Sequence, residues 1–299
     1  MDVRKFNRYV AQHAAPAPHV SAIFSLMPRN DLACSLLTEQ QNRPLLSALI
    51  LAPEEPGNVP FGLGVGPHLG AKPANTLANV GRNGEIVFST RSICRQQCSF
   101  EVNEFTGAIL FRDWSSKYTT QTVGKTARSF EYGRHPRRVV VTPTCNREIE
   151  FGPVGNRYRF MIIWHAKPPE TTALSRQIDI IRVARTLDDN ETELPSGMVT
   201  RIHTAKDPSL KLRWVSKITL GRGTYGKVFS ALDIDTGDAF AVKRIKGPGS
   251  RERLKAIRRE IEIMQTLRHV SKSIPHCAFH LLVSDFRSPI SRIHPLSRE

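Results

Sequence analysis

The chain has 299 residues, of which 40% are hydrophobic, and its 43 basic and 27 acidic residues give a formal net charge of +16. This hydrophobic fraction excludes a chain that is disordered throughout, and the length allows one large domain or two small ones. The positive charge favours anionic partners such as nucleotides, phosphorylated proteins, nucleic acid or an acidic membrane surface. A solvated basic surface without a specific partner is the alternative interpretation.

A membrane-spanning segment, a signal peptide and a metal site find no support in the sequence. The longest apolar run, residues 45–51, is too short to cross a bilayer, and residues 1–5 have no apolar segment behind them that would make a signal peptide. The five cysteines are odd in number and lack zinc-ligand spacing. We therefore predict a reduced, intracellular chain in the nucleus or cytoplasm, with no membrane partner and no metal site.

Residues 1–58 carry several prolines and weak periodicity, which predicts a flexible tail with at most one short helix. Residues 59–166 then show short strand-like segments separated by turn signals, with no helical segment between them. This pattern of short strands and turns predicts a β-sandwich. The candidate strands are residues 85–88, 98–102, 108–111, 139–141, 148–151 and 158–164.

Residues 167–210 are polar and mixed, and we predict an interdomain linker there. Residues 211–270 form a second predicted unit, with strands at 214–220, 227–232 and 239–245 followed by a helix. The helix is predicted from one apolar stripe, made of Leu254, Ile257, Ile261, Met264 and Leu267. Residues 271–299 have no clear period and are predicted to be an irregular tail. The predicted fold class is therefore mostly β, in two units.

A glycine-rich segment joins the first two strands of the second unit. Gly221, Gly223 and Gly226 have the spacing G-x-G-x-x-G. A dinucleotide-binding Rossmann unit needs a helix after these glycines, but a strand follows here, so that interpretation fails. In a hairpin, the three glycines let the backbone approach phosphate oxygens closely. Lys243 on the next strand supplies a positive charge for the α- and β-phosphates, and Glu260 on the following helix is placed to pair with that lysine.

These elements resemble the N-terminal lobe of eukaryotic serine/threonine protein kinases, in the order and spacing of that family. The resemblance covers about sixty residues and implies an antiparallel sheet with one helix. It implies ATP as the ligand, with Leu220, Val228 and Ala241 lining the adenine pocket and Lys243 paired with Glu260. Magnesium is implied only if a catalytic lobe is supplied.

The sequence departs from that family in its last part. Neither a His-Arg-Asp catalytic loop nor an Asp-Phe-Gly motif is present, and the Asp-Phe at residues 285–286 lacks the glycine. We therefore assign no catalytic residue and expect no phosphate transfer by this chain alone. The loss of pattern after His269 suggests a truncated or mis-spliced product.

The first unit resembles a forkhead-associated (FHA) domain, a β-sandwich whose loops bind phosphothreonine peptides. The family pattern is Gly-Arg, then Ser-x-x-His, then Asp-x-Ser-x-Asn-Gly-Thr. Arg82 matches the arginine, while Cys94, Gln97 and Lys117 stand where the family has serine, histidine and asparagine, and Thr119 matches the last threonine.

This resemblance implies phosphopeptide binding by Arg82, Cys94, Arg95 and Lys117, with Arg91 adding to the positive charge. Phosphorylated proteins are then the expected partners. The alternative is that these residues decorate solvated loops on a sandwich whose binding site has decayed.

Two functions follow, from different classes. The first is a serine/threonine protein kinase homologue that keeps its ATP-binding lobe and an FHA domain but has lost its catalytic lobe, in the layout of fungal checkpoint-type kinases. The second is a non-catalytic phosphothreonine-peptide adaptor with a vestigial kinase fragment. Nucleic-acid binding is weaker, because no recognisable nucleic-acid module accompanies the basic charge.

Overall fold

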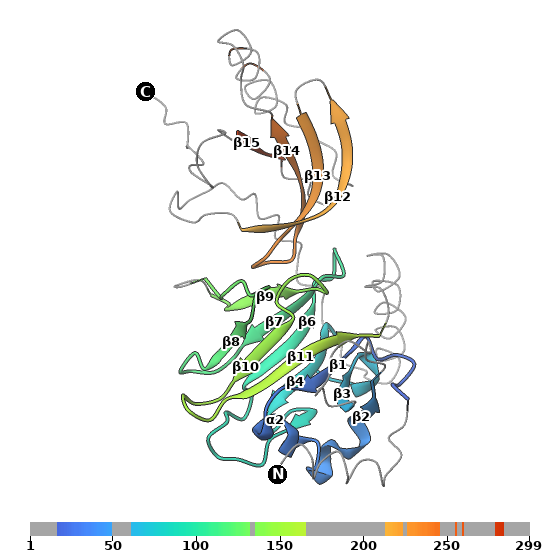
Figure 1. Ribbon diagram of the computed structural model, residues 1–299, viewed down its shortest axis with the longest axis vertical. Helices are drawn as coiled ribbons and strands as arrows, with labels where there is room; N and C mark the ends of the chain where they lie inside the picture. The colour runs from blue at the N-terminus through green and yellow to red at the C-terminus, as the bar shows by residue number, and fades with distance from the viewer. Residues whose placement is uncertain are drawn as a thin grey trace, which may run out of the picture. The chain divides into compact units, whose positions relative to one another are not determined.

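The computed structural model describes residues 17–49, 61–131, 135–165, 213–223, 226–245 and 279–283, together with residues 255 and 259. The chain divides into two units (Figure 1). The first comprises Met1–Ser196 and Ile234–Asp238, and the second comprises Gly197–Asp233 and Ala239–Glu299. The linker predicted over residues 167–210 lies outside the described residues.

The first unit is built from a six-stranded and a five-stranded sheet. The six-stranded sheet runs, from edge to edge, β2 (Leu46–Ala48), β3 (Phe61–Val65), β1 (Phe24–Pro28), β11 (Tyr158–Trp164), β10 (Glu148–Phe151) and β8 (Thr120–Val123). The five-stranded sheet runs β5 (Ile86–Val87), β4 (Thr76–Gly81), β6 (Cys98–Val102), β7 (Ile109–Asp113) and β9 (Arg138–Val141). Pairing is antiparallel except between β4 and β5.

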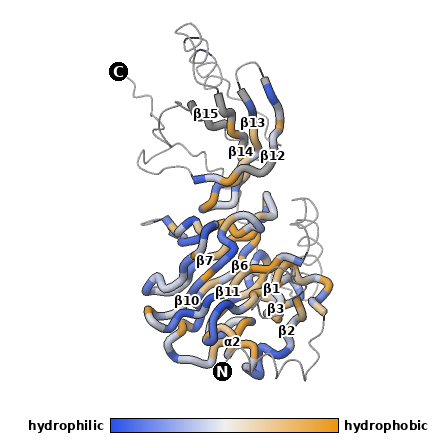
Figure 2. The backbone as a smooth tube through the Cα atoms, viewed as in Figure 1, coloured by the Kyte–Doolittle hydropathy of each residue, from blue (hydrophilic) through white to orange (hydrophobic). Residues whose placement is uncertain are grey.

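Aromatic side chains from both sheets meet in the core. The rings of Phe24 on β1 and Phe100 on β6 pack edge to face with centroids 5.0 Å apart, and both side chains are fully buried. Phe88 packs in the same way against Phe151 of β10 at 5.2 Å. Each such ring contributes roughly 1.5–3 kcal/mol by leaving water, which makes these contacts a main source of stability. Hydrophobic and hydrophilic stretches follow one another along the chain of this unit (Figure 2).

The predicted strands of the sandwich are confirmed, with ends that differ by at most two residues. The tail predicted over residues 1–58 is wrong for its described part. β1 lies between β3 and β11 with all five residues buried, and it leads into α2 (Asp31–Leu36), a 3₁₀ turn η1 (Gln40–Leu45) and β2. A strand buried on both faces shows a short continuous apolar run instead of alternation, which is why the sequence pattern did not reveal it. A further 3₁₀ turn, η2 (Pro67–Leu69), precedes β4.

The second unit is a four-stranded sheet in the order β12 (Trp214–Gly223), β13 (Gly226–Asp233), β14 (Ala239–Ile245) and β15 (Phe279–Val283). The first three strands confirm the prediction. β15 corrects it, because it lies within the predicted irregular tail and pairs with β14 in parallel, so the sheet is not purely antiparallel. A small core of Ala231, Phe240 and Val242, with Trp214 against it, supports the sheet. Of the predicted helix, only Lys255 and Arg259 are described, and both are helical.

Among the described residues, no helix has the length and hydrophobicity that crossing a membrane requires.

Candidate functional site

The glycine segment forms the end of the β12–β13 hairpin. Gly221 pairs with Val228 and Gly223 with Gly226, and the register of the two strands shifts twice before the glycines, between Ser216 and Ile218 and again before Gly221. Such bulges increase the local twist of a hairpin. A Cβ atom built on Gly221 meets no atom of the described residues within 4 Å. Packing within the described chain therefore does not require glycine there, whereas a ligand lying against the backbone would.

The lysine predicted to bind phosphate lies on the adjacent strand in the same row. Val228 of β13 pairs with Gly221 on one side and with Lys243 of β14 on the other, and Lys243 pairs in turn with Leu281 of β15. The backbone thus brings the first glycine and the lysine together across three neighbouring strands, which stand about 4.8 Å apart.

The structure describes only some of the other residues that were predicted to bind the nucleotide. Leu220 is 57% exposed and Val228 is half-buried. Ala241 lies two residues before Lys243 on β14 and pairs with Ser230. Glu260 and the residues between Gly223 and Gly226 lie outside the described residues, so the Lys243–Glu260 pair stays a prediction.

Comparison with known proteins finds similarity to protein kinases in this part of the chain. Residues 214–275 match the protein kinase domain family. The chain is 33% identical over 84 residues to "Mitogen-activated protein kinase kinase kinase A" of Dictyostelium discoideum, covering 26% of this chain and 9% of that protein. It is 44% identical over 81 residues to "NUAK family SNF1-like kinase 1" of Mus musculus, covering 26% of this chain and 12% of that protein.

A third relative is "MAP kinase kinase kinase SSK2" of Saccharomyces cerevisiae, which is 34% identical over 64 residues, or 20% of this chain and 4% of that protein. The chain therefore spans only 9%, 12% and 4% of the length of these three relatives, respectively. No solved structure gives a significant match. The comparisons support a kinase-like second unit and leave the first unit without an assignment.

The predicted phosphopeptide residues lie on three loops of the first unit. Gly81 ends β4, and a Cβ atom there would come within 2.4 Å of the Arg95 carbonyl oxygen, so only glycine allows the two loops to approach this closely. Arg82 follows, and its backbone N–H donates to the Cys94 carbonyl at 3.1 Å while its side-chain Nε donates to the Ile93 carbonyl at 2.8 Å. Arg82, Cys94 and Arg95 are therefore brought together.

Gln97 links these two loops to the third. Its side chain is 1% exposed, and Nε2 donates to the hydroxyl oxygens of Thr119 and Thr120, both at 2.9 Å. Its Oε1 accepts from the Cys94 N–H at 3.3 Å. A buried amide with both ends engaged fixes the separation of the loops on which its partners lie.

The third loop, residues 114–119, is held by its own hydrogen bonds. Asp113 Oδ1 accepts from the backbone N–H of Ser115 at 2.9 Å and from its hydroxyl at 2.7 Å, and Ser115 Oγ accepts from the Thr119 N–H at 2.8 Å. Tyr118 takes a left-handed conformation with φ of +53°, which closes the turn. Lys117, just before it, is exposed.

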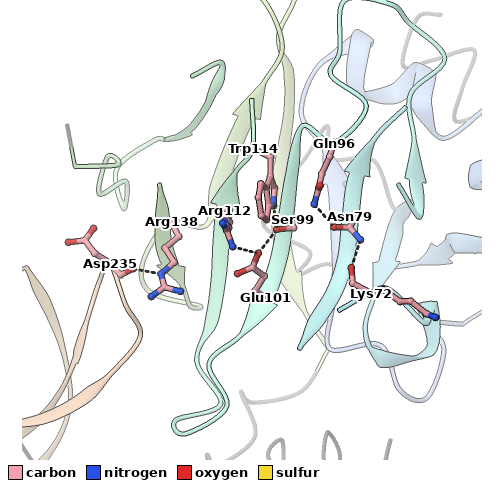
Figure 3. A network of polar contacts seen from close by, with 9 residues as sticks. All are labelled: Lys72, Asn79, Gln96, Ser99, Glu101, Arg112, Trp114, Arg138 and Asp235. Carbon is pink, nitrogen blue, oxygen red and sulfur yellow. Dashed lines mark hydrogen bonds and ion pairs between the residues drawn. The ribbon is translucent and has the colours of Figure 1, made fainter. Parts of the chain in front are cut away.

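Side chains on or next to the five-stranded sheet anchor the same loop at both ends. Trp114 Nε1 donates to Ser99 Oγ at 2.8 Å, and the Arg112 guanidinium lies 3.5 Å from the centre of the Trp114 ring (Figure 3). Arg137 pairs with Asp113 Oδ2 at 3.1 Å and lies 4.3 Å from the centre of the Tyr118 ring. The sequence analysis missed Arg137, because nothing in its local pattern indicates a partner on a distant loop.

Proposed function

We propose that the second unit holds ATP in the manner of a protein kinase, with the β12–β13 hairpin over the phosphates and Lys243 beside them. The observation that carries this proposal is the row of Gly221, Val228 and Lys243 across three strands, within the segment that matches the protein kinase domain. The open space at the Cβ position of Gly221 supports a ligand lying close to the backbone. Leu220, Val228 and Ala241 would then contact the adenine.

Phosphate transfer needs more than a hairpin and a lysine that hold the nucleotide. A kinase uses an aspartate to orient the substrate hydroxyl, and an aspartate and an asparagine to hold magnesium. The 299 residues contain no His-Arg-Asp or Asp-Phe-Gly motif to supply them. We therefore propose that this chain binds nucleotide without transferring phosphate by itself.

Nucleotide binding is tested by titrating the full chain with a fluorescent ATP analogue. Lys243→Ala should weaken binding at least about tenfold, because a charge-assisted contact to phosphate contributes roughly 1.5–3 kcal/mol. Lys227→Ala is the matched control, since Lys227 is exposed on the neighbouring strand, and it should leave the affinity within about twofold. Equal affinity in both variants would refute the proposed role of Lys243 in nucleotide binding. Lys243-dependent transfer of labelled phosphate to a protein would refute the proposal that the chain does not transfer phosphate by itself.

For the first unit we propose FHA-type recognition of phosphothreonine peptides, which fits the adaptor function as well as the kinase function. Three local features support it. Gly81 allows the close approach that places Arg82 beside the loop carrying Cys94 and Arg95. Gln97 holds the loops together at the position where the FHA pattern has histidine. Tyr118 adopts a left-handed conformation where that pattern has glycine.

The test compares binding of a phosphothreonine peptide library with its unphosphorylated counterpart. Arg82→Ala and Lys117→Ala should each weaken phosphate-dependent binding at least about tenfold. The second variant matters because Arg82 also supports its loop through a hydrogen bond, whereas Lys117 is exposed. Lys125→Ala, another exposed lysine on a different turn, is the control and should bind normally. Binding that does not depend on the phosphate, or that is unchanged in both variants, would refute phosphothreonine recognition. It would favour the alternative that the binding site has decayed.

A further inference from the structure

The connection between β13 and β14 belongs to the first unit, although the two strands themselves belong to the second. This connection, Ile234–Asp238, is called the buried turn below. Ile234 and Asp235 are each 2% exposed, and Gly237 is buried as well. Connections between strands ordinarily lie at the surface, so the burial of this one needs a cause. The cause lies in the β6–β7 turn, Asn103–Gly107, and in β9.

Four consecutive carbonyl oxygens of the buried turn accept hydrogen bonds from four different residues of these two elements. Two of the donors come from β9. The Val140 N–H donates to the Ile234 carbonyl at 2.6 Å. Arg138 Nε donates to the Asp235 carbonyl at 3.1 Å (Figure 3). Since β9 is the last strand of its sheet, these bonds occupy a sheet edge.

The other two donors come from the β6–β7 turn. Asn103 Nδ2 donates to the Thr236 carbonyl at 2.9 Å and to Asp238 Oδ1 at 3.0 Å. Thr106 Oγ1 donates to the Gly237 carbonyl at 2.6 Å, and Thr106 is only 7% exposed. Because all four carbonyls belong to the main chain, the first unit recognises the conformation of the turn more than its side chains.

The β6–β7 turn fixes its two donors by bonds of its own. Asn103 Oδ1 accepts from the N–H groups of Phe105 at 3.0 Å and Thr106 at 3.1 Å. The Asn103 carbonyl accepts from the Gly107 N–H at 2.8 Å, and Thr106 Oγ1 accepts from the Ala108 N–H at 3.2 Å. These bonds do not involve the buried turn, so little ordering of Asn103 and Thr106 is needed to bind it.

Gly237 makes the fit selective. Its φ of +75° is a left-handed conformation that glycine adopts readily. A Cβ atom built there would lie 3.3 Å from the Asn103 Cβ, the Ala108 Cβ and Leu110 Cδ2. The site therefore fits a tight turn with glycine at this position, and no phosphate takes part in the recognition.

The buried turn also closes the hairpin that carries residues proposed to hold ATP. Leu232 pairs with Ala239 on its two sides, and farther along the same strands Val228 pairs with Lys243. The connection between two antiparallel strands helps to set their register. Fixing the turn therefore limits the arrangements that Val228 and Lys243 can take.

We propose that the first unit recognises the buried turn as an internal ligand and thereby favours the nucleotide-binding arrangement of β13 and β14. The residues proposed for phosphothreonine are not among its donors, so the first unit has a second recognition site, for an unphosphorylated turn. The effect on nucleotide rests on the ATP binding proposed above. A contact that selects the binding arrangement raises the apparent affinity in proportion to the fraction of chains that adopt it.

The test uses the full chain with Thr106→Val, Asn103→Ala and Gly237→Ala. Each variant should accelerate hydrogen exchange of the Val140 amide at least about tenfold, because that N–H is bonded to the buried turn. Each should also weaken binding of a fluorescent ATP analogue at least about threefold. Thr106→Val keeps the shape of the side chain and lies outside the hairpin, so it decides the test if the other two variants disturb folding.

Two variants serve as matched controls. Asn156→Ala removes an exposed asparagine from the β10–β11 turn. Gly155→Ala places alanine at another positive φ, +88°, where a Cβ atom meets no atom of the described residues within 4 Å. Both controls should leave the Val140 exchange rate and the ATP affinity within about twofold of the parent chain.

Three outcomes would contradict parts of this picture separately. Val140 exchange in Thr106→Val equal to that in the controls would overturn recognition of the turn. Faster exchange with unchanged ATP affinity would overturn its effect on nucleotide binding. If the parent chain does not bind the analogue, the ATP function fails together with the effect that rests on it, while the exchange rates still decide whether the first unit recognises the turn.

Discussion

Replacing Gln97 with alanine should lower the stability of the first unit and also weaken phosphothreonine binding by its loops. The substitution removes three hydrogen bonds, two from Nε2 and one to Oε1, and leaves a small cavity at a site that is 1% exposed. Each bond contributes roughly 0.5–1.5 kcal/mol net, so we expect a loss of about 2–4 kcal/mol in the free energy of unfolding. Gln97→His, which restores a buried side chain with hydrogen-bonding capacity, should recover part of this loss.

The assay is urea denaturation followed by tryptophan fluorescence. The chain has three tryptophans, and a Trp214→Phe background leaves only Trp114 and Trp164, both in the first unit. The same variants are then tested for phosphothreonine binding, which should fall in Gln97→Ala because the loops lose their fixed separation. A destabilisation below about 0.5 kcal/mol, the level of an ordinary surface substitution, would refute the role assigned to Gln97.

Three further predictions concern the same unit. Burial alone raises the pKa of Glu150, but hydrogen bonds and nearby arginine charges outweigh it and hold that pKa below the ordinary 4.5. Glu150 therefore stabilises the fold above pH 4.5, and this stability is lost as the pH falls through its folded pKa, so Glu150→Gln should flatten the acid limb of an unfolding titration. Gly81→Ala should cost about 1–3 kcal/mol in urea denaturation, because the new Cβ would lie 2.4 Å from the Arg95 carbonyl oxygen; an unchanged midpoint would contradict the close approach. Burial, aided by Asp31, raises the pKa of the Cys34 thiol to about 11, so in peptide mapping a maleimide at pH 8 should label half-buried Cys94 well before Cys34.

Local patterns predicted the elements whose signal is contained in a few neighbouring residues. β6, β10 and β11 were predicted because their side chains alternate or run apolar between clear turns, and the nucleotide hairpin because its glycines and lysine have a fixed spacing. β1 was missed, since a short strand buried on both faces among prolines resembles a loop in sequence. β15 was missed because its pairing with β14 follows a long connection and leaves no periodic trace.

The candidate sites divide in the same way. The residues of the glycine hairpin are close in sequence, so their grouping was visible before the structure. The hydrogen bonds of Asn30 to Arg157 and Arg159 were not, because they form only through the pairing of β1 with β11. Gln97 was noticed only as a departure from a family pattern, and its hydrogen bonds to Thr119 and Thr120 depend on loops that the fold brings together.

The central position of β1 also determines when the first unit can form during synthesis. Phe24 pairs with Trp164, and Ser25 contacts His165 at 2.7 Å across 140 residues of chain. On a ribosome, the amino-terminal strand emerges early and must wait for β11 before the middle of its sheet is closed. Until then it exposes apolar side chains and unpaired backbone, the conditions under which chaperones bind nascent chains and strands mispair. A version of this unit that began at residue 59 would lack both β1 and β2, so β3 would lose both of its neighbours and β11 would keep an open edge.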